Sequence, residues 1–350
     1  MHAVRLHAFG PAGNLTYEEV PDPAPAPGQV RIAVEAAGVH VLDTVIRAGV
    51  TGGPMALPEL PTIPGREVAG TVDALGEGTS PDWLRRRVAV HLGMVPGGYA
   101  SVAVADAAAL QPVPDQLGLP AAVAMIGTGR TVMGVLREAE IAPGDTVLVL
   151  SAAGGMGALL VQYAKHHGAR VIGAAGGEAK TALVRELGAD LAVDYTGPDW
   201  TDRVREAYGE HPVRHLFDGS GATPGRAALT LLAPGSTRYA YSRPLTEPDG
   251  AVENRPGDEA ATGSGADSRT GAAPTEAAIA EDLSARGITV RGLDPQRMMA
   301  QKRELETESL TLAAKGVLDP LVHTFPMAKA AAAHHALETR ATSGKVVLIP

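Results

Sequence analysis

Residues 150–157 read LSAAGGMG, so three glycines lie within four positions between an apolar run and a long amphipathic stretch. The residues that lead into the turn, DTVLVLSA, are aliphatic and β-branched and predict a buried strand. Residues 155–167 predict a helix. A glycine turn between a strand and a helix is typical of the dinucleotide-binding fingerprint, G-x-G-x-x-G. The alternative is a tight turn that binds no ligand.

The three fingerprint positions hold Ala152, Gly154 and Gly157, with Gly155 as an additional glycine. Gly154 has no side chain to hold off a pyrophosphate, and Gly157 allows the helix to pack closely on the strand. The N-terminus of the helix then offers free N–H groups and the positive end of the helix dipole to the phosphates. The residues expected to surround a pyrophosphate are Ala153, Gly154, Gly155, Met156 and Gly157.

The end of the second strand, residues 174–177, reads AAGG and carries no carboxylate. A site that prefers NAD usually has an acid here, which binds the ribose 2′-hydroxyl. Without that acid a 2′-phosphate is not repelled. Lys180 at the start of the next helix is suited to pair with this phosphate, although Glu178 lies close by. The sequence therefore favours NADPH; the alternative for Lys180 is a solvated helix residue.

Strands and helices alternate through the middle of the chain, which predicts a parallel, doubly wound α/β sheet. The further strands are expected at 169–175, 191–195, 214–220, 237–242 and 288–293, with a helix at 178–189. By contrast, the first 120 residues consist of short alternating runs between Pro and Gly turns, which predict β-strands. Residues 320–350 predict an alanine-rich helix and one more strand of that same type. We therefore expect a β-rich domain built from both ends of the chain, with the nucleotide domain inserted.

An acidic segment interrupts this pattern at about 246–275. It has almost no large apolar residues, and it contains six carboxylates against two arginines. Such a composition does not bury enough apolar surface to order itself, so a disordered surface loop is expected.

The composition excludes several classes of protein. The 350 residues contain no Cys, which excludes disulfides and any Cys-ligated zinc or iron–sulfur cluster. The net charge of −9 and the aromatic content of 3% argue against nucleic acid and anionic membranes as partners. The N-terminus, MHAVRLHAFG, shows no apolar secretory segment, so a cytoplasmic location is expected.

Further segments make a family resemblance specific. They are AAGVHVLDTVIRAG (36–49), PTIPGREVAGTV (61–72), SAAGGMG (151–157), ELGADLAVDY (186–195) and LETRATSGKVVLIP (337–350). With these segments the chain resembles the medium-chain dehydrogenase/reductase superfamily, and within it the zinc-free quinone oxidoreductase (zeta-crystallin-like) branch. The resemblance implies a Rossmann domain at 125–294, inserted in a GroES-like domain formed by 1–124 and 295–350. It also implies a homodimer that forms through edge strands of the nucleotide sheet.

The resemblance assigns roles around NADPH, with the nicotinamide between the two domains. Lys180 and Tyr195 would border the adenosine 2′-phosphate, and Arg340 would approach it from the C-terminal segment. Thr131 would lie near the nicotinamide, and Ser220, followed by Gly221, would line the region beside the fourth strand.

Zinc alcohol dehydrogenases of this superfamily bind their catalytic metal with Cys, the His of a G-H-E block and a third ligand. This chain has no Cys, and its G-H-E position reads Gly65, Arg66, Glu67. We therefore expect no metal site.

Without a Lewis acid, the expected hydride acceptor is a quinone or an activated alkene such as an enone, whose reduction gives a delocalised oxyanion. His40 stands where the branch usually has Asn, and Val45 stands where it often has Tyr. An imidazole can act as a general acid, so His40 is a candidate proton donor; the alternative is a packed histidine. Asp43, the other candidate of the catalytic region, is expected to orient the loop.

The sequence is also compatible with two other functions. One is an enoyl reductase that acts on a thioester in a polyketide-type tailoring pathway. The other is a non-catalytic NADPH-binding protein with a structural or RNA-binding role, although the negative charge disfavours RNA.

Overall fold

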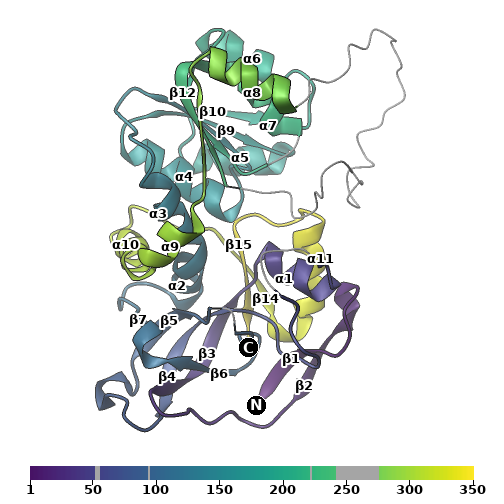
Figure 1. Ribbon diagram of the computed structural model, residues 1–350, viewed down its shortest axis with the longest axis vertical. Coiled ribbons are helices and arrows are strands. Elements are labelled where there is room, and N and C mark those ends of the chain that lie inside the picture. Colours follow the sequence, from purple (N-terminus) through teal and green to yellow (C-terminus); the bar gives the residue numbers. More distant parts are fainter. Residues whose placement is uncertain (52–55, 94, 221–222, 242–275) are drawn as a thin grey trace.

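A computed structural model describes residues 1–51, 56–93, 95–220, 223–241 and 276–350. The chain forms two layered domains, a parallel sheet covered by helices and an antiparallel sheet that contains both ends of the chain (Figure 1). This arrangement confirms the expected fold class. The acidic segment at 246–275 and Gly221 lie outside the described residues.

The parallel sheet has six strands in the order β10-β9-β8-β11-β12-β13. All neighbouring pairs are parallel. The strands are β8 (Thr146–Leu150), β9 (Arg170–Ala175), β10 (Leu191–Asp194), β11 (Val213–Asp218), β12 (Leu232–Ala240) and β13 (Thr289–Gly292). In such a sheet, ligands bind at the carboxyl ends of the strands where the order reverses, which is here between β8 and β11.

Helices cover this sheet. They are α4 (Gly155–His166), α5 (Glu178–Glu186), α6 (Trp200–Tyr208), α7 (Thr223–Ala228) and α8 (Glu276–Ala285). α4 begins directly after the glycine turn and buries Leu159 and Leu160. α5 is shorter than expected, because the chain turns at Gly188, whose φ of +101° is in the left-handed region that favours glycine. β12 begins five residues earlier than the expected start at residue 237.

The antiparallel sheet joins strands from both ends of the chain, as the sequence predicts. β15 (Lys345–Ile349) pairs parallel with β14 (Val322–Pro326) and antiparallel with β3 (Gln29–Gly38). The remaining strands of this sheet are β4 (Glu67–Leu75), β5 (Arg87–His91), β6 (Val102–Asp106) and β7 (Gln111–Pro112). Beside it lie a hairpin of β1 (His2–Leu6) and β2 (Leu15–Glu19), and the helices α1 (Val41–Ala48) and α11 (Ala330–Glu338).

Two segments cross between the domains. The first consists of α2 (Leu119–Ala124), a π-helical turn (Met125–Gly129) and α3 (Arg130–Leu136); the second consists of α9 (Pro295–Ala300) and α10 (Lys302–Ala314). Leu119–Leu136 is long and apolar enough to cross a membrane, but 67% of it is buried inside the molecule, as in a core helix. We propose domain boundaries at 124/125, between α2 and the π-helical turn of the first crossing, and at 294/295, where the second crossing begins.

The main hydrophobic core extends across both domains. Ala36, Ala69 and Ala89 of the antiparallel sheet belong to the same buried cluster as Val147 and Leu160 of the nucleotide domain. α2 and α3 supply the side chains between them. The two domains therefore meet at a packed junction, and the functional residues described below lie along it.

Candidate functional site

The glycine turn is held in the form that a phosphate site needs. Ser151 adopts a φ of +53°, and Gly154 is the N-cap of α4. A Cβ on Gly157 would lie 2.2 Å from the Ser151 carbonyl oxygen and 2.8 Å from the Ala152 Cα. Because any side chain there would force α4 away from β8, the close packing predicted for Gly157 is present. α4 begins directly after the glycine turn. The unpaired backbone N–H groups of its first helical turn, which includes Met156, therefore lie at the end of the glycine turn.

A segment from the other domain closes on this turn. The Gly344 N–H donates to the Ala153 carbonyl over 2.8 Å, and the two segments form a short parallel bridge between Gly154 and Gly344. A Cβ on Gly155 would lie 3.3 Å from Thr128 Cγ2 and 3.5 Å from the Lys345 nitrogen. The turn is therefore bounded by the first crossing segment, which contains Thr128, and by the start of β15.

The residues assigned to the 2′-phosphate gather at the 174–177 turn. Lys180 Nζ donates to the Arg340 carbonyl over 2.6 Å. The Tyr195 ring lies against Gly176, where an added Cβ would be 3.4 Å from Tyr195 Cε2. Burial lowers the pKa of Lys180, and the charge of Arg340 lowers it further. Two neighbouring cations that depress a pKa in this way form an environment that an added anion would relieve.

One carboxylate near this end, that of Asp194, is occupied by hydrogen bonds. Asp194 Oδ1 accepts from the Gly177 N–H at 2.9 Å, from the Thr196 N–H at 3.0 Å and from the Thr196 hydroxyl at 2.7 Å. Asp194 therefore holds the two loops together and does not compete with an anion beside Lys180.

Ser220 lies directly after β11, at the reversal point of the sheet. Its N–H and hydroxyl donate to Asp218 Oδ1 at 3.1 and 3.0 Å, and Arg238 binds Asp218 Oδ2 at 2.7 Å. Asp218 is 1% exposed. This buried ion pair fixes the position of Ser220 at the carboxyl end of the strand.

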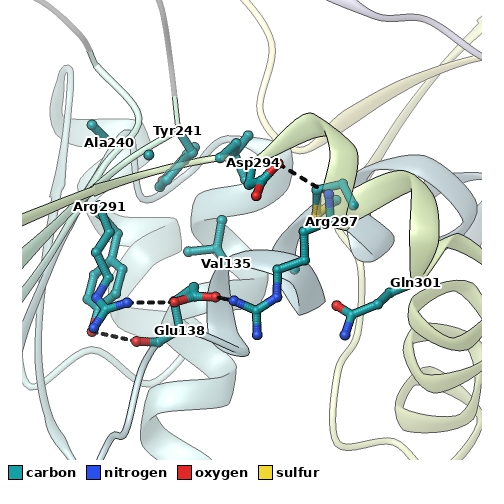
Figure 2. Close-up of a pocket in the computed structure, with 13 residues that line it drawn as sticks. Val135, Glu138, Ala240, Tyr241, Arg291, Asp294, Arg297 and Gln301 are labelled. Carbon is teal, nitrogen blue, oxygen red and sulfur yellow. Dashed lines mark hydrogen bonds and ion pairs between the residues drawn. The ribbon is translucent and has the colours of Figure 1, made fainter.

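A cavity of about 240 Å³ opens at the carboxyl ends of β12 and β13 (Figure 2). Tyr241 and Val135 line it, and Glu138 at its edge is bound by Arg291 at 2.6 Å and by Arg297. The Tyr241 hydroxyl is buried and has no hydrogen-bond partner in the described part of the chain, and burial raises its pKa. This cavity was missed by sequence reasoning, although its position follows from the strand-end rule.

A second cluster lies on the antiparallel sheet and contains His40. His40 Nε2 lies 2.6 Å from Glu67 Oε1, and Lys345 Nζ lies 2.9 Å from Glu67 Oε2 and 3.0 Å from His40 Nε2. Glu67 is fully buried, Lys345 is 5% exposed, and the His40 side chain is 26% exposed. Burial alone would raise the pKa of Glu67, but the charges of His40 and Lys345 hold it well below its ordinary range.

Two glycines make room for this ion pair. A Cβ on Gly38 would lie 2.5 Å from Glu67 Oε2, and one on Gly127 would lie 1.4 Å from Glu67 Oε1. Gly127 belongs to the π-helical turn, and its carbonyl accepts from the Thr131 hydroxyl at 2.9 Å. The structure therefore brings Thr131, the residue assigned to the nicotinamide end, within one helical turn of the His40 cluster.

Glu67 and Lys345 were not identified as site residues from the sequence, although both lie in segments that carry the resemblance. The available signal was a charged residue at the start of an otherwise apolar strand, in GREVAG for Glu67 and in GKVVLIP for Lys345.

Asp43 lies behind His40, where it fixes the start of α1. Its Oδ2 accepts from the His40 N–H at 2.8 Å and from the Tyr99 hydroxyl at 3.1 Å, and Arg66 Nε lies 3.5 Å from its Oδ1. Tyr99 in turn contacts His334 Nε2 of α11 at 3.1 Å. Asp43 is 3% exposed, which supports an orienting role and not contact with a substrate.

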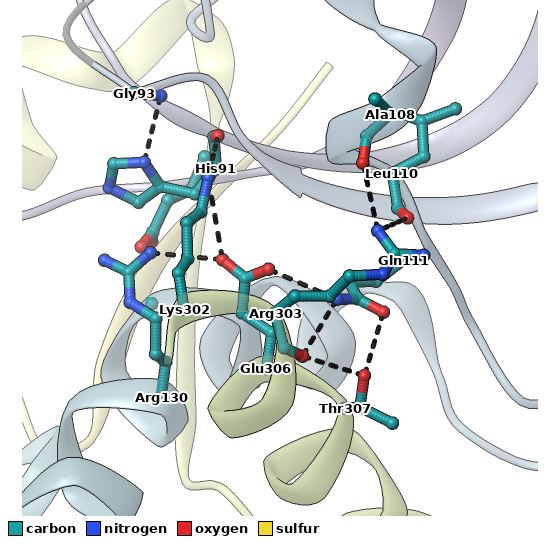
Figure 3. Close-up of polar contacts among 12 residues, drawn as sticks. His91, Gly93, Ala108, Leu110, Gln111, Arg130, Lys302, Arg303, Glu306 and Thr307 are labelled. Atoms are coloured by element: carbon teal, nitrogen blue, oxygen red, sulfur yellow. Dashed lines mark hydrogen bonds and ion pairs between the residues drawn. The ribbon is translucent and has the colours of Figure 1, made fainter. Parts of the chain in front are cut away.

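His91 stands beside this cluster, and Figure 3 shows it next to Lys302, Arg130 and Glu306. Its ring lies edge-on to the His40 ring, with centroids 6.4 Å apart. Its backbone carbonyl accepts from Lys302 Nζ at 3.4 Å. Nearby, Arg130 of α3 binds Glu306 of α10 at 3.1 Å. These contacts bring charged groups from both crossing segments to His91.

Within the described ranges, no group of three or more His, Asp or Glu side chains has the geometry to hold a metal ion.

Comparisons with known proteins match both domains. Residues 26–115 match the alcohol dehydrogenase GroES-like domain family, and residues 155–247 match the zinc-binding dehydrogenase family. The chain is 33% identical to a 2-haloacrylate reductase of Burkholderia sp, over 99% of this chain and 98% of the relative. It is 30% identical to a quinone oxidoreductase of Salmonella typhimurium, over 99% of each.

Solved structures agree with these relatives. A mycobacterial protein complexed with NADPH is similar with a TM-score of 0.78 and 30% identity, over 100% of both chains. The quinone oxidoreductase of Escherichia coli complexed with NADPH has a TM-score of 0.79 and 27% identity, also over 100% of both chains.

Proposed function

Because the chain belongs to the zinc-free quinone oxidoreductase branch of the medium-chain dehydrogenase/reductase superfamily, we propose that this oxidoreductase uses NADPH to reduce a quinone or an activated alkene such as an enone. The observation that carries the proposal is the acid-free turn at 174–177, where Lys180 donates to the Arg340 carbonyl at 2.6 Å. A site built this way favours the cofactor that carries an additional phosphate.

The residues of both domains fit this cofactor. The turn at 151–157 offers backbone N–H groups to the pyrophosphate, and Lys180 with Arg340 offers cations to the 2′-phosphate. The cavity beside Tyr241 is lined by Val135 of α3, the helix that contains Thr131, and this supports a nicotinamide position toward the β12 and β13 ends of the sheet. When bound, NADPH supplies a hydride, and the chain contributes orientation and electrostatic stabilisation.

The acceptor belongs beside His40, at the junction of the domains. His40 is the candidate proton donor because its ring keeps 26% exposure while its partners Glu67 and Lys345 are buried. The similarity to a 2-haloacrylate reductase supports an alkene conjugated to a carboxylate or carbonyl group. Such an alkene accepts hydride without a metal, because the charge spreads onto oxygen.

An acceptor panel tests the function. The protein is mixed with NADPH and, in turn, a small quinone, an enone, a 2-haloacrylate and an enoyl thioester, and the loss of nicotinamide absorbance is followed. We expect oxidation of NADPH with the quinone or with the two conjugated alkenes. Activity restricted to the enoyl thioester would favour the tailoring-pathway alternative. If none of the four acceptors is reduced while NADPH binds, the proposed function is wrong.

We also propose a homodimer that forms through β13. This strand is at the edge of the parallel sheet and is hydrogen-bonded to β12 on one side. All four of its residues are exposed, and Val290 at 50% and Leu293 at 36% are exposed apolar side chains. An exposed edge strand with apolar side chains is a surface that a second copy can pair with.

A further inference from the structure

His91 combines three features that the proposed function does not use. It follows three buried residues at the end of β5, directly across from Glu67 in the register of β4 and β5. Its ring stands beside that of His40. One of its two ring nitrogens, Nδ1, accepts from the backbone, and among the described residues no hydrogen bond is formed by the other, Nε2.

The backbone contact determines which tautomer His91 adopts. The Gly93 N–H donates to His91 Nδ1 at 3.0 Å (Figure 3). A nitrogen that accepts a hydrogen bond carries no proton, so Nδ1 is the bare nitrogen of the ring. The neutral imidazole therefore has its proton on Nε2, and that N–H is available as a donor.

The surroundings keep the ring neutral. Burial lowers the pKa of His91 to about 3, because the pull of Glu67 is outweighed by burial together with Arg130, His40 and Arg66. The charged groups around it come from every neighbouring element. They are Glu67 of β4 with the preceding Arg66, His40 before α1, Arg130 of α3, and Lys302 and Glu306 of α10.

The position also fits a substrate contact. The Glu67 carboxylate contacts His40 and lies close to Gly127. The Gly127 carbonyl accepts a hydrogen bond from Thr131, which the proposed function places near the nicotinamide. His91 lies on the same face as Glu67, since residues directly opposite in antiparallel strands project to one side of a sheet. An acceptor that reaches from Thr131 toward His40 would meet the His91 ring.

We propose that His91 is a catalytic residue that donates a hydrogen bond from Nε2–H to the acceptor's carbonyl or quinone oxygen. The inference rests on the proposed function. When bound, NADPH would give up a hydride to the β-carbon of the acceptor and become NADP+. The C=C π electrons would move toward the carbonyl oxygen, and the resulting oxyanion would accept the hydrogen bond from His91 Nε2–H. His91 keeps its proton; one proton from His40 or water completes the reduction. A neutral imidazole suits this role because it donates without exchanging protons over the working pH range.

Two substitutions separate donation from packing. His91→Leu removes the donor, and His91→Gln retains an amide N–H. We expect His91→Leu to lower kcat by about 100-fold, which is the usual effect of losing one oxyanion donor. His91→Gln should lose much less, and neither substitution should change NADPH affinity in calorimetry. The loss should be larger with an enone than with a quinone, whose ring spreads the charge. The matched control, His166→Leu, changes an exposed histidine at the far end of α4 and should behave as wild type.

A second measurement does not depend on turnover. Histidine side-chain nitrogen NMR of the wild-type protein, assigned with the His91→Gln variant, should show Nδ1 unprotonated and Nε2 protonated from pH 5 to pH 8. A proton on Nδ1, titration of His91 within this range, or wild-type kcat in His91→Leu would overturn the proposal. If the wild-type protein reduces no acceptor, the proposed function itself fails, and the NMR result still decides the tautomer.

Discussion

At the scale of single residues, Lys180 carries most of the cofactor preference. Its ammonium donates to the Arg340 carbonyl, so it lies beside the other cationic residue assigned to the 2′-phosphate. Burial and the neighbouring Arg340 lower its pKa. Neither the carbonyl nor the guanidinium of Arg340 neutralises the Lys180 ammonium, so a phosphate is a suitable counter-ion at this position.

We therefore predict that Lys180→Ala weakens NADPH binding by about 10-fold or more, on the scale of one charge-assisted hydrogen bond of about 1.5–3 kcal/mol. Binding of NADH, which lacks the 2′-phosphate, should change little. Titration calorimetry with both cofactors measures the difference. The control is Lys315→Ala, an exposed lysine at the C-terminus of α10. An equal loss for NADH and NADPH would reject the role of Lys180.

At the scale of elements, a buried hydrogen-bond chain connects α1 to α11. The Asp43 carboxylate accepts a hydrogen bond from the Tyr99 hydroxyl, and the oxygen of that hydroxyl is hydrogen-bonded to His334 Nε2. Since the Tyr99 proton points to Asp43, His334 donates from Nε2, and its Nδ1 is buried without a partner among the described residues. Burial lowers the pKa of His334 to about 4. The two helices are therefore joined through a neutral histidine.

His334 in this hydrogen-bond chain, together with His91, makes the free energy of unfolding depend on pH. Both histidines are neutral in the folded and unfolded states above their ordinary pKa of 6.5 and contribute nothing there. As the pH falls below 6.5, the unfolded chain takes up protons while the folded chain, with pKa values of about 3 and about 4, does not. The free energy of unfolding should then decrease by about 1.4 kcal/mol per pH unit for each histidine.

Urea unfolding between pH 6.5 and pH 5 measures this slope before the carboxylates titrate. His334→Gln should remove the contribution of one histidine and reduce the slope, whatever its effect on the absolute stability. A free energy of unfolding that stays constant over this interval in the wild-type protein would contradict the prediction.

The elements also show what the sequence could and could not predict. The turn from β8 to α4 and the short spacing from Lys180 to Tyr195 are local patterns, so their geometry follows from nearby residues. The contact between His40 and Lys345 joins positions 305 residues apart. No periodicity or motif specifies that distance, because it depends on β15 lying next to β3. The tautomer of His91 was equally out of reach, since it depends on a single backbone N–H.

At the scale of the whole molecule, two sheets share one core, and β13, whose residues are exposed, forms an edge of the parallel sheet. A dimer through β13 would extend the six-stranded parallel sheet across two copies. Analytical ultracentrifugation should show a dimer, and Val290→Lys should convert it to a monomer, because a charge on the edge strand opposes pairing. Val95→Lys, at another exposed valine, serves as the control. A wild-type protein that sediments as a monomer would exclude the dimer.

The pairing of β15 with β3 also affects the assembly of the chain during translation. Residue 345 is made 305 positions after residue 40. At ribosomal speeds of 5–20 residues per second, this corresponds to a delay on the order of 15–60 s. Throughout that delay one margin of β3 lacks its neighbour, and the buried acid of Glu67 lacks its ammonium. The antiparallel sheet is therefore completed only when the last residues of the chain have been made.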